Sequence, residues 1–334
     1  MEARVKTSLD CIRRISGARV LVVGDVMLDT YLACRALGVA DEAPVPLLEI
    51  RGQSRTLGGA ANVARNLARL GARTALVGIV GSDPEAEAIK GLLRESGVEG
   101  SLLETHRSTT LKTRVLSGDH YYLRLDEEEL SPPTEAEQAA LAARIEARLS
   151  EADLLVVSDY DKGLLSPDLS ERVQRLAREG GRRIVADLKP RNALHWRHLH
   201  LIAPNLSEAR SLCAQLDSGG EPGDDVETIA ERLRSRMGCA VVLKMGSRGM
   251  LIAPPSGPTS RLEALCPSPV EVSGAGDTVL ATLAAALAQG ADLHQAAWLA
   301  NLAASVSVSR PGTHAVSAAE LTEAVLQSSQ PSRA

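Results

Sequence analysis

Short apolar runs rich in Val, Ile and Leu alternate with longer helical patterns along most of this chain. The first run is Arg19–Val26, and the runs at 154–158, 183–187 and 240–246 each follow a helical segment. Continuous apolar strands of this type are buried on both faces, which requires helices on each side of a parallel sheet. The alternation therefore predicts an α/β fold with a mostly parallel central sheet covered on both faces.

Two segments interrupt this alternation. Residues 31–56 contain a strand-like run flanked by Pro44 and Pro46, which suit the edge of a sheet. Residues 107–126 have the pattern of a hairpin whose turn lies at 117–119. We expect the two segments to form a small β-sheet lid that excludes water from a site. The 334 residues are expected to form one domain with these segments inserted.

Composition excludes several classes of protein. The formal charge is −5 with acidic and basic residues interspersed, and the chain has no Phe, four Tyr and two Trp. A nucleic-acid partner is therefore not expected. Five scattered cysteines without a C-x-x-C pattern indicate reduced intracellular thiols. No apolar run approaches the roughly 18–20 residues that cross a membrane, so we expect no membrane partner and a cytoplasmic location.

Near the C-terminus, a strand-like run ends in Gly274-Ala275-Gly276-Asp277, and a long Ala/Leu helical pattern follows. Small residues at the start of a helix leave backbone amides free to face an anion, and the helix dipole favours negative charge there. Asp277 could take a proton from a hydroxyl that attacks a phosphoryl group held by those amides. The alternative is a tight strand-to-helix turn with an acidic residue in its first helical turn.

Two groups of residues near the N-terminus are candidates for a ligand site. Asp25 and Asp29 follow the first strand, at the edge where open α/β sheets bind ligands. Gly58 and Gly59 precede a helix and permit close backbone approach, and Asn62 can bond hydroxyls as donor and acceptor. Helix caps or loop acids would give similar patterns.

Asn205 and Glu208 stand one helical turn apart and could hold Mg²⁺ through water. Ordinary helix capping is the alternative, with Ser207 as an equally suitable cap. The segment His195–His200 contains three histidines but no accompanying carboxylate or cysteine pattern, so a loop is expected there rather than a metal site. The chain also lacks a P-loop, a Gly-x-Ser-x-Gly elbow and the third glycine of a dinucleotide fingerprint.

Three motifs occur in a characteristic order: Gly58-Gly59-Ala60-Ala61-Asn62, Asn205-x-x-Glu208 and Gly274-Ala275-Gly276-Asp277. With them, the chain from about 18 to 327 resembles the ribokinase-like (PfkB) carbohydrate kinases. Within that family it is most similar to the bacterial kinases of a heptose 7-phosphate. The narrower resemblance is carried by the runs at 24–29, 42–46, 58–64, 158–163 and 204–208. It implies a ribokinase-like three-layer fold and ATP-dependent phosphorylation of the anomeric hydroxyl of D-glycero-β-D-manno-heptose 7-phosphate.

The resemblance also implies roles for particular residues. Asp277 would be the base, and the amides of Gly274, Ala275 and Gly276 would hold the transferring phosphoryl group. The residues that would serve ATP and Mg²⁺ are Asn205, Leu206, Ser207 and Glu208. Those expected along the nucleotide are Lys244, Gly246, Gly249 and Asn301. Those expected at the sugar hydroxyls are Asp25, Asp29, Gly58, Gly59 and Asn62. Lys162 and Arg124 are the candidates for the substrate's phosphate.

One position departs from the family pattern. Glu271 stands where the family usually has Asp, at a position associated with a monovalent-cation site, so activation by K⁺ is left open. The resemblance further implies a homodimer formed through the lid and a separate adenylyltransferase acting on the product. The alternatives are another PfkB-family kinase of a sugar or nucleoside, a non-catalytic sugar or nucleotide sensor, and, more distantly, a dinucleotide-dependent oxidoreductase.

Overall fold

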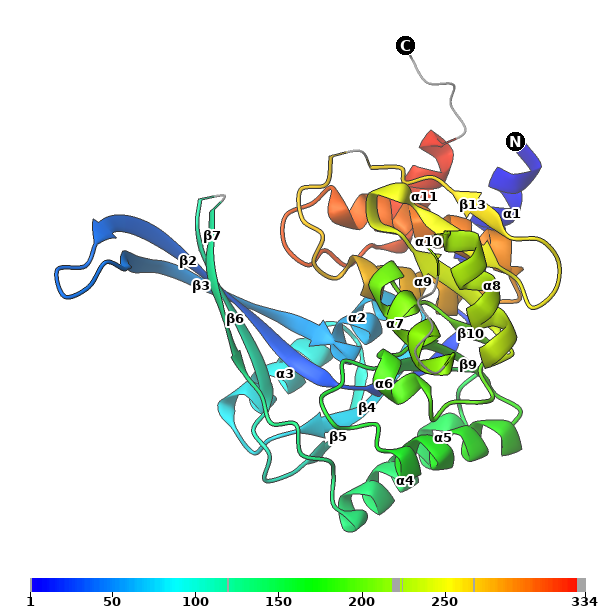
Figure 1. The fold of residues 1–334 in the computed structure, drawn as a ribbon, viewed down its shortest axis with the longest axis horizontal. Coiled ribbons are helices and arrows are strands. Elements are labelled where there is room, and N and C mark those ends of the chain that lie inside the picture. Colours follow the sequence, from blue (N-terminus) through cyan, green and yellow to red (C-terminus); the bar gives the residue numbers. More distant parts are fainter. Residues whose placement is uncertain (1, 119, 218–222, 224, 267, 329–334) are drawn as a thin grey trace.

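The computed structural model describes residues 2–328 except 119, 218–222, 224 and 267, and its main element is a nine-stranded sheet (Figure 1). The strand order is β13-β12-β11-β10-β9-β8-β1-β4-β5. The strands are β1 (Arg19–Gly24), β4 (Arg73–Val80), β5 (Glu99–Glu104), β8 (Leu154–Ser158), β9 (Arg183–Asp187), β10 (Leu201–Ile202), β11 (Ala240–Lys244), β12 (Met250–Ala253) and β13 (Ser260–Leu262). All neighbours pair in parallel except at the β12 and β13 edge, which confirms the mostly parallel sheet.

Helices cover both faces of this sheet because successive strand residues point to opposite sides. Val20 and Val22 of β1 belong to one apolar core, while Leu21 and Val23 belong to the other. The first core is closed by α1 (Glu2–Ile15), α2 (Ala60–Arg69), α3 (Pro84–Glu95), α9 (Ala275–Ala288), α10 (Leu293–Val308) and α11 (Ala318–Gln327). The second is closed by α4 (Glu135–Leu149), α5 (Pro167–Glu179), α6 (Pro190–Ala193), α7 (Leu206–Leu216) and α8 (Val226–Met237). The three-layer α/β prediction is confirmed.

A second sheet of four strands projects from this body (Figure 1). Its order is β3-β2-β6-β7, with β2 parallel to β6 and the other pairs antiparallel. The strands are β2 (Val26–Val39), β3 (Pro46–Gly59), β6 (Thr110–Ser117) and β7 (His120–Glu127). We refer to these four strands as the lid sheet. The predicted hairpin is present as β6 and β7, and Asp119 of its predicted turn lies outside the described residues.

The boundary between the two sheets differs from the prediction. The apolar run expected as one strand over Arg19–Val26 ends at Gly24, and a new strand starts at Val26 in the lid sheet. The lid sheet therefore extends over 26–59, beyond the expected 31–56. Hydrophobicity could not mark this break, because apolar residues continue on both sides of Asp25 and are buried in both sheets. Within the described ranges, every helix is too short or too polar to cross a membrane.

Candidate active site

The residues of the candidate site, predicted and unpredicted, gather at one edge of the central sheet, beyond the carboxyl ends of its parallel strands. Asp25 follows β1, Asp159 and Tyr160 follow β8, Asp187 ends β9, and Lys244 ends β11. The parallel pairing of these strands aligns their ends, so residues far apart in sequence meet there. The N-terminus of α9 joins the same edge through the hydrogen bonds of Asp277.

Asp277 lies in the first turn of α9 and is 5% exposed. The Tyr160 hydroxyl donates to its Oδ1 at 2.6 Å, and the Asn62 amide donates to its Oδ2 at 2.8 Å. Burial raises the pKa of Asp277 to about 6, although both hydrogen bonds oppose that rise. The carboxyl group is therefore mostly ionised at neutral pH and can accept a proton from a hydroxyl beside it.

The turn before α9 requires small residues. Gly274 caps the helix with φ +78°, in the left-handed region that favours glycine. A side chain there would also collide, since a Cβ would lie 2.5 Å from Thr313 Cγ2 and 2.9 Å from Asn62 Nδ2. A Cβ at Gly276 would lie 3.3 Å from Lys244 Nζ. The Gly274–Gly276 turn thus sits against Asn62 on one side and the Lys244 ammonium on the other.

The residues expected at the sugar lie together at the base of the lid sheet. Asp25 is buried and accepts hydrogen bonds from the amides of Tyr160 at 2.8 Å and Lys162 at 3.2 Å. Burial raises the pKa of Asp25, and these backbone hydrogen bonds oppose the rise. Asp29 is paired with Arg114 at 2.6 Å. A Cβ at Gly58 would lie 2.7 Å from Oδ2 of Asp29, so only glycine fits beside this carboxylate.

Asn62 connects this group to the N-terminus of α9 through its hydrogen bond to Asp277. Gly59, at the end of β3, has φ +56° and precedes α2, which carries Asn62 in its first turn. Gly58, Gly59 and Asn62 are therefore held next to Asp29, Asp25 and Asp277, respectively.

The two cations expected at the substrate's phosphate belong to one network of ion pairs. Lys162 is paired with Glu128 at 2.6 Å, and Lys112 lies 2.9 Å from Asp126 and 3.5 Å from Glu128. Arg124 bonds Asp126 at 2.8 Å, and its side chain is half exposed on β7. The Lys162 side chain is mostly buried, and its amide donates to Asp25. Arg124 lies at the solvent side of the network.

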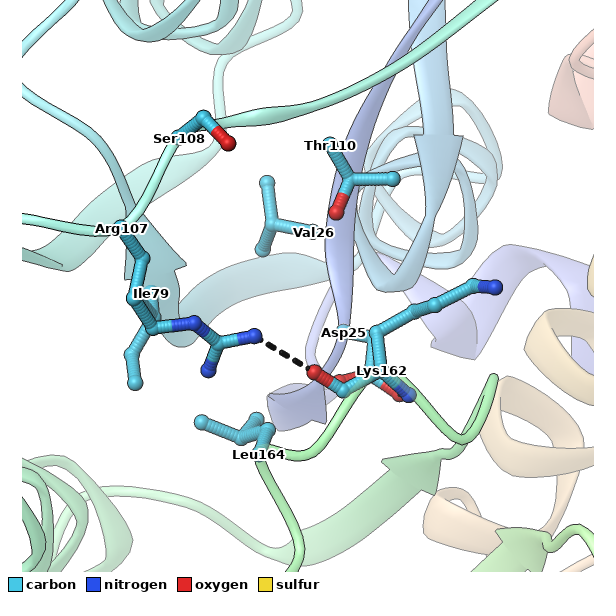
Figure 2. Close-up of a pocket in the computed structure, with 8 residues that line it drawn as sticks. All are labelled: Asp25, Val26, Ile79, Arg107, Ser108, Thr110, Lys162 and Leu164. Atoms are coloured by element: carbon cyan, nitrogen blue, oxygen red, sulfur yellow. Dashed lines mark hydrogen bonds between the residues drawn. The ribbon is translucent and has the colours of Figure 1, made fainter. Parts of the chain in front are cut away.

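A small pocket lies next to Lys162 at the junction of the body and the lid sheet (Figure 2). Figure 2 shows the Arg107 guanidinium pointing toward the Lys162 backbone, and the Lys162 side chain extending away from it. Arg107 donates to the Lys162 carbonyl at 2.7 Å and also to the Glu129 carbonyl. Arg107 thus ties the chain that leaves β7 to the loop after β8.

A cavity of about 370 Å³ lies on the other side of the Gly274–Gly276 turn from Asn62. Four of the residues expected along the nucleotide line it, namely Lys244, Gly246, Gly249 and Asn301. Asn205, Ala275 and Gly276 also contribute to its wall. The Asn301 amide donates to the Glu263 carbonyl at 2.7 Å, and Lys244 is paired with Asp187. Apolar walls with a few polar groups are typical of a site for a small ligand.

Asn205 is the N-cap of α7 and forms a capping box with Glu208. The helix-capping interpretation is therefore correct for Asn205, while Ser207 is not the cap. Glu208 also forms an ion pair with Lys189. Burial would raise the pKa of Glu208, but Lys244, Lys189 and the Asn205 amide lower it, so the carboxylate is ionised. Leu206 packs toward the second apolar core, and Ser207 is exposed.

These acids fit a hard cation. Glu208 is ionised, and Asp187 faces the same two lysines, Lys189 and Lys244. Glu208 is paired with Lys189 and Asp187 with Lys244, and their oxygens are of the kind that Mg²⁺ prefers when it keeps several waters. Asn205 lines the cavity next to them. The chemistry of this donor set supports a magnesium site held through water.

Four residues at the site were missed by sequence reasoning: Tyr160, Arg114, Asp187 and Lys189. Asp187 and Lys189 could have been found, because they follow a strand that ends at the ligand-binding edge. Tyr160 stands in one of the runs that carry the resemblance, but nothing local indicates its bond to Asp277. Arg114 contacts Asp29, 85 positions away, through the pairing of β2 with β6. Such contacts follow from the topology and not from a motif.

Solved structures with this fold are similar over nearly the whole chain. Phosphofructokinase-2 from Escherichia coli, in a crystal structure with potassium, has a TM-score of 0.79 and 20% identity over 94% of this chain and 100% of that chain. Ribokinase from Thermotoga maritima has a TM-score of 0.71 and 20% identity, covering 93% and 99%. At these identities the likeness shows the ribokinase-like fold alone.

Sequence comparisons go further. The chain is 40% identical over 312 residues to the bifunctional protein HldE of Caulobacter vibrioides and 39% identical over 316 residues to that of Pseudomonas putida. Each match covers 93% of this chain but 64% of the relative, so the chain spans less than two thirds of their length. The model of the pfkB family carbohydrate kinases matches residues 18–320. The chain therefore belongs to the pfkB family of carbohydrate kinases, which are ATP-dependent phosphotransferases.

Proposed function

We propose that this kinase transfers the γ-phosphoryl group of ATP to the anomeric hydroxyl of D-glycero-β-D-manno-heptose 7-phosphate, giving the 1,7-bisphosphate and ADP. The observation that carries the proposal is the position of Asp277. Its buried carboxylate lies between Asn62 and Tyr160, with the acids Asp25 and Asp29 on one side and the Lys244 cavity on the other. The sequence resemblance to heptose 7-phosphate kinases supports the choice of sugar.

In the proposed reaction, the sugar hydroxyl gives its proton to the Asp277 carboxylate as its oxygen attacks the γ-phosphorus. The bond from that phosphorus to the β,γ-bridging oxygen breaks, and ADP leaves. The amides at the start of α9 and the Lys244 ammonium stabilise the negative charge on the transferring group. When bound, Mg·ATP supplies the phosphoryl group, and Asn205 and Glu208, with Asp187, would hold the ion through water.

The phosphate on carbon 7 needs a cation, since phosphate is bound strongly by Lys and Arg. We propose that Lys162 supplies it, because its side chain is 18% exposed and its amide already binds Asp25. Lys112 and Arg114 extend the same positive face along β6, and Arg124 closes it at the solvent side. An incoming phosphate would take over the hydrogen bonds that Glu128 and Asp126 accept in the free protein.

A coupled ADP-release assay over a panel of acceptors tests the substrate. The panel contains the heptose 7-phosphate, the same heptose without phosphate, fructose 6-phosphate, ribose and adenosine, each with and without K⁺. The proposal predicts the highest kcat/KM for the heptose 7-phosphate. Preference for ribose or adenosine would favour another pfkB-family kinase, and the absence of ADP release with every acceptor would favour a sensor.

The oligomeric state, the downstream enzyme and the cellular location are also proposals. We infer a homodimer through the lid sheet, because apolar side chains such as Val39, Ile50 and Leu125 are 67%, 62% and 54% exposed there. The phosphofructokinase-2 neighbour from Escherichia coli has been solved as a tetramer. A separate adenylyltransferase would act on the bisphosphate, in ADP-heptose and lipopolysaccharide core synthesis. A cytoplasmic location, where ATP and Mg²⁺ are supplied, belongs to the same proposal.

A further inference from the structure

Each carboxylate oxygen of Asp277 accepts one side-chain hydrogen bond. Asn62 reaches the carboxylate from the first turn of α2, and Tyr160 reaches it from the loop after β8, 117 positions away in sequence. At 2.6 Å, the Tyr160 hydroxyl is the nearer of the two donors. Because the carboxylate is buried, these two bonds replace the water that would otherwise solvate its charge.

Tyr160 is itself fixed at both ends. Its amide donates to Asp25 at 2.8 Å, which anchors the backbone to the sugar side of the site. The Lys189 ammonium lies 5.3 Å from the centre of its ring, and Lys189 is paired with Glu208 on the nucleotide side. Burial, followed by the nearby Asp277 charge, raises the pKa of Tyr160 well above its ordinary value, so the hydroxyl remains a donor.

We propose that Tyr160 is a positioning residue for the base, whose hydroxyl orients the Asp277 carboxylate and keeps it ionised for proton transfer. The inference rests on the proposed role of Asp277. During transfer the sugar proton goes to the carboxylate, and the phenol keeps its own proton. A hydrogen bond to a charged acceptor is among the strong ones, so its loss should shift the protonation equilibrium of a buried acid.

Other charged groups act on the same carboxylate. Lys244 lowers the pKa of Asp277, and Asp187 raises it. These two are paired with each other, so their effects partly cancel. The Tyr160 hydroxyl is therefore a suitable group to change, because its removal alters one hydrogen bond and leaves the charges in place.

The test is Tyr160→Phe, which keeps the ring and removes the hydroxyl. We expect the pKa of Asp277 to rise by about one unit, so that kcat/KM falls about fivefold near pH 6 and about tenfold below pH 5, and approaches the wild-type value above pH 8. Tyr121→Phe, on the half-exposed Tyr121 of β7, is the matched control and should leave the profile unchanged. A loss of the same size at every pH would indicate a merely structural role and overturn the proposal.

A second measurement does not depend on turnover. The carboxyl carbons of ¹³C-labelled aspartate are titrated by NMR in wild type and Tyr160→Phe, and the Asp277 signal is assigned by its absence in Asp277→Asn. The expected result is a midpoint near 6 that moves upward in the variant; equal midpoints would refute the inference. If the wild type phosphorylates no sugar, the proposed function fails, and this titration alone still decides whether Tyr160 controls Asp277.

Discussion

The central sheet buries its apolar residues, whereas the lid sheet leaves several of its apolar residues exposed. In β8, all five residues are buried, because helices cover both faces of the central sheet. In β7, Tyr121 and Leu125 are each 54% exposed, although both are apolar enough for a core. The body therefore carries its own apolar core, while the lid sheet leaves apolar surface that another molecule can cover.

The charged residues of the candidate site are likewise divided between the body and the lid sheet. Asp277, Lys244 and Glu208 are held by helices and strand ends of the body, where the surrounding core fixes their positions. Arg114 and Arg124 lie on the lid sheet, where they are paired with Asp29 and Asp126. The proposed base and nucleotide residues thus belong to the body, as does Lys162, whereas Arg124, the other proposed phosphate ligand, lies on the lid sheet.

The largest expected difference between the two regions is in stability. Leu155→Ala in β8 removes a fully buried side chain, so the free energy of unfolding should fall by about 2.7–5 kcal/mol. Leu125→Ala in β7, at a half-exposed position, should change the free energy of unfolding of the dissociated protomer by no more than about 0.5 kcal/mol. Urea unfolding of the two variants measures both values. Equal losses would show that the lid sheet has a core of its own.

At the junction of the two regions, Lys162→Met should weaken recognition of the substrate's phosphate. Loss of a charged hydrogen bond predicts a fall in kcat/KM of about tenfold to hundredfold for the heptose 7-phosphate. Turnover of the unphosphorylated heptose should stay the same. Lys90→Met, which removes a surface ion pair on α3, is the control. An equal effect on both sugars would place the phosphate elsewhere.

A charged substitution tests whether the exposed apolar surface of the lid sheet is the dimer interface. Ile50→Asp should weaken the proposed dimer by about tenfold or more, because a buried carboxylate without a partner is unfavourable. Leu326→Asp, at a half-exposed position on α11 of the body, should leave the assembly unchanged. Analytical ultracentrifugation measures both. A dimer unaffected by Ile50→Asp but broken by Leu326→Asp would move the interface to the body.

The smallest effect is expected at Glu271. Its carboxylate accepts hydrogen bonds from the Ser273 amide at 2.9 Å and hydroxyl at 2.7 Å, next to the turn that precedes α9. We expect K⁺ to change the wild-type kcat little, and Glu271→Asp to raise the response to K⁺ by a few-fold, since the shorter side chain restores the family pattern. Assays in K⁺ and in a large organic cation at equal ionic strength compare the two proteins.

Most helices and strands and several residues of the candidate site could be predicted from the sequence, whereas contacts between distant segments could not. The buried strands of the central sheet and the start of α9 at Gly274 are local patterns that the sequence indicates directly. The strand-like run expected before that turn is wrong, because residues 270–272 form a loop in which Val270 and Val272 are each 65% exposed. The break at Asp25 was missed because apolar residues continue from one sheet into the next. Tyr160 and Arg114 were missed because their partners are 117 and 85 positions away, and only the strand order brings them together.

The proposed reaction requires the Asp277 carboxylate to take the proton of the sugar hydroxyl. Its most direct test is a single-turnover experiment on Asp277→Asn with Mg·ATP and the heptose 7-phosphate, alongside ATP binding by calorimetry. We expect phosphoryl transfer to fall by roughly 10²–10⁴-fold, the usual contribution of general acid–base catalysis, while the ATP dissociation constant stays within a few-fold. Transfer at the wild-type rate would contradict the assignment of the base.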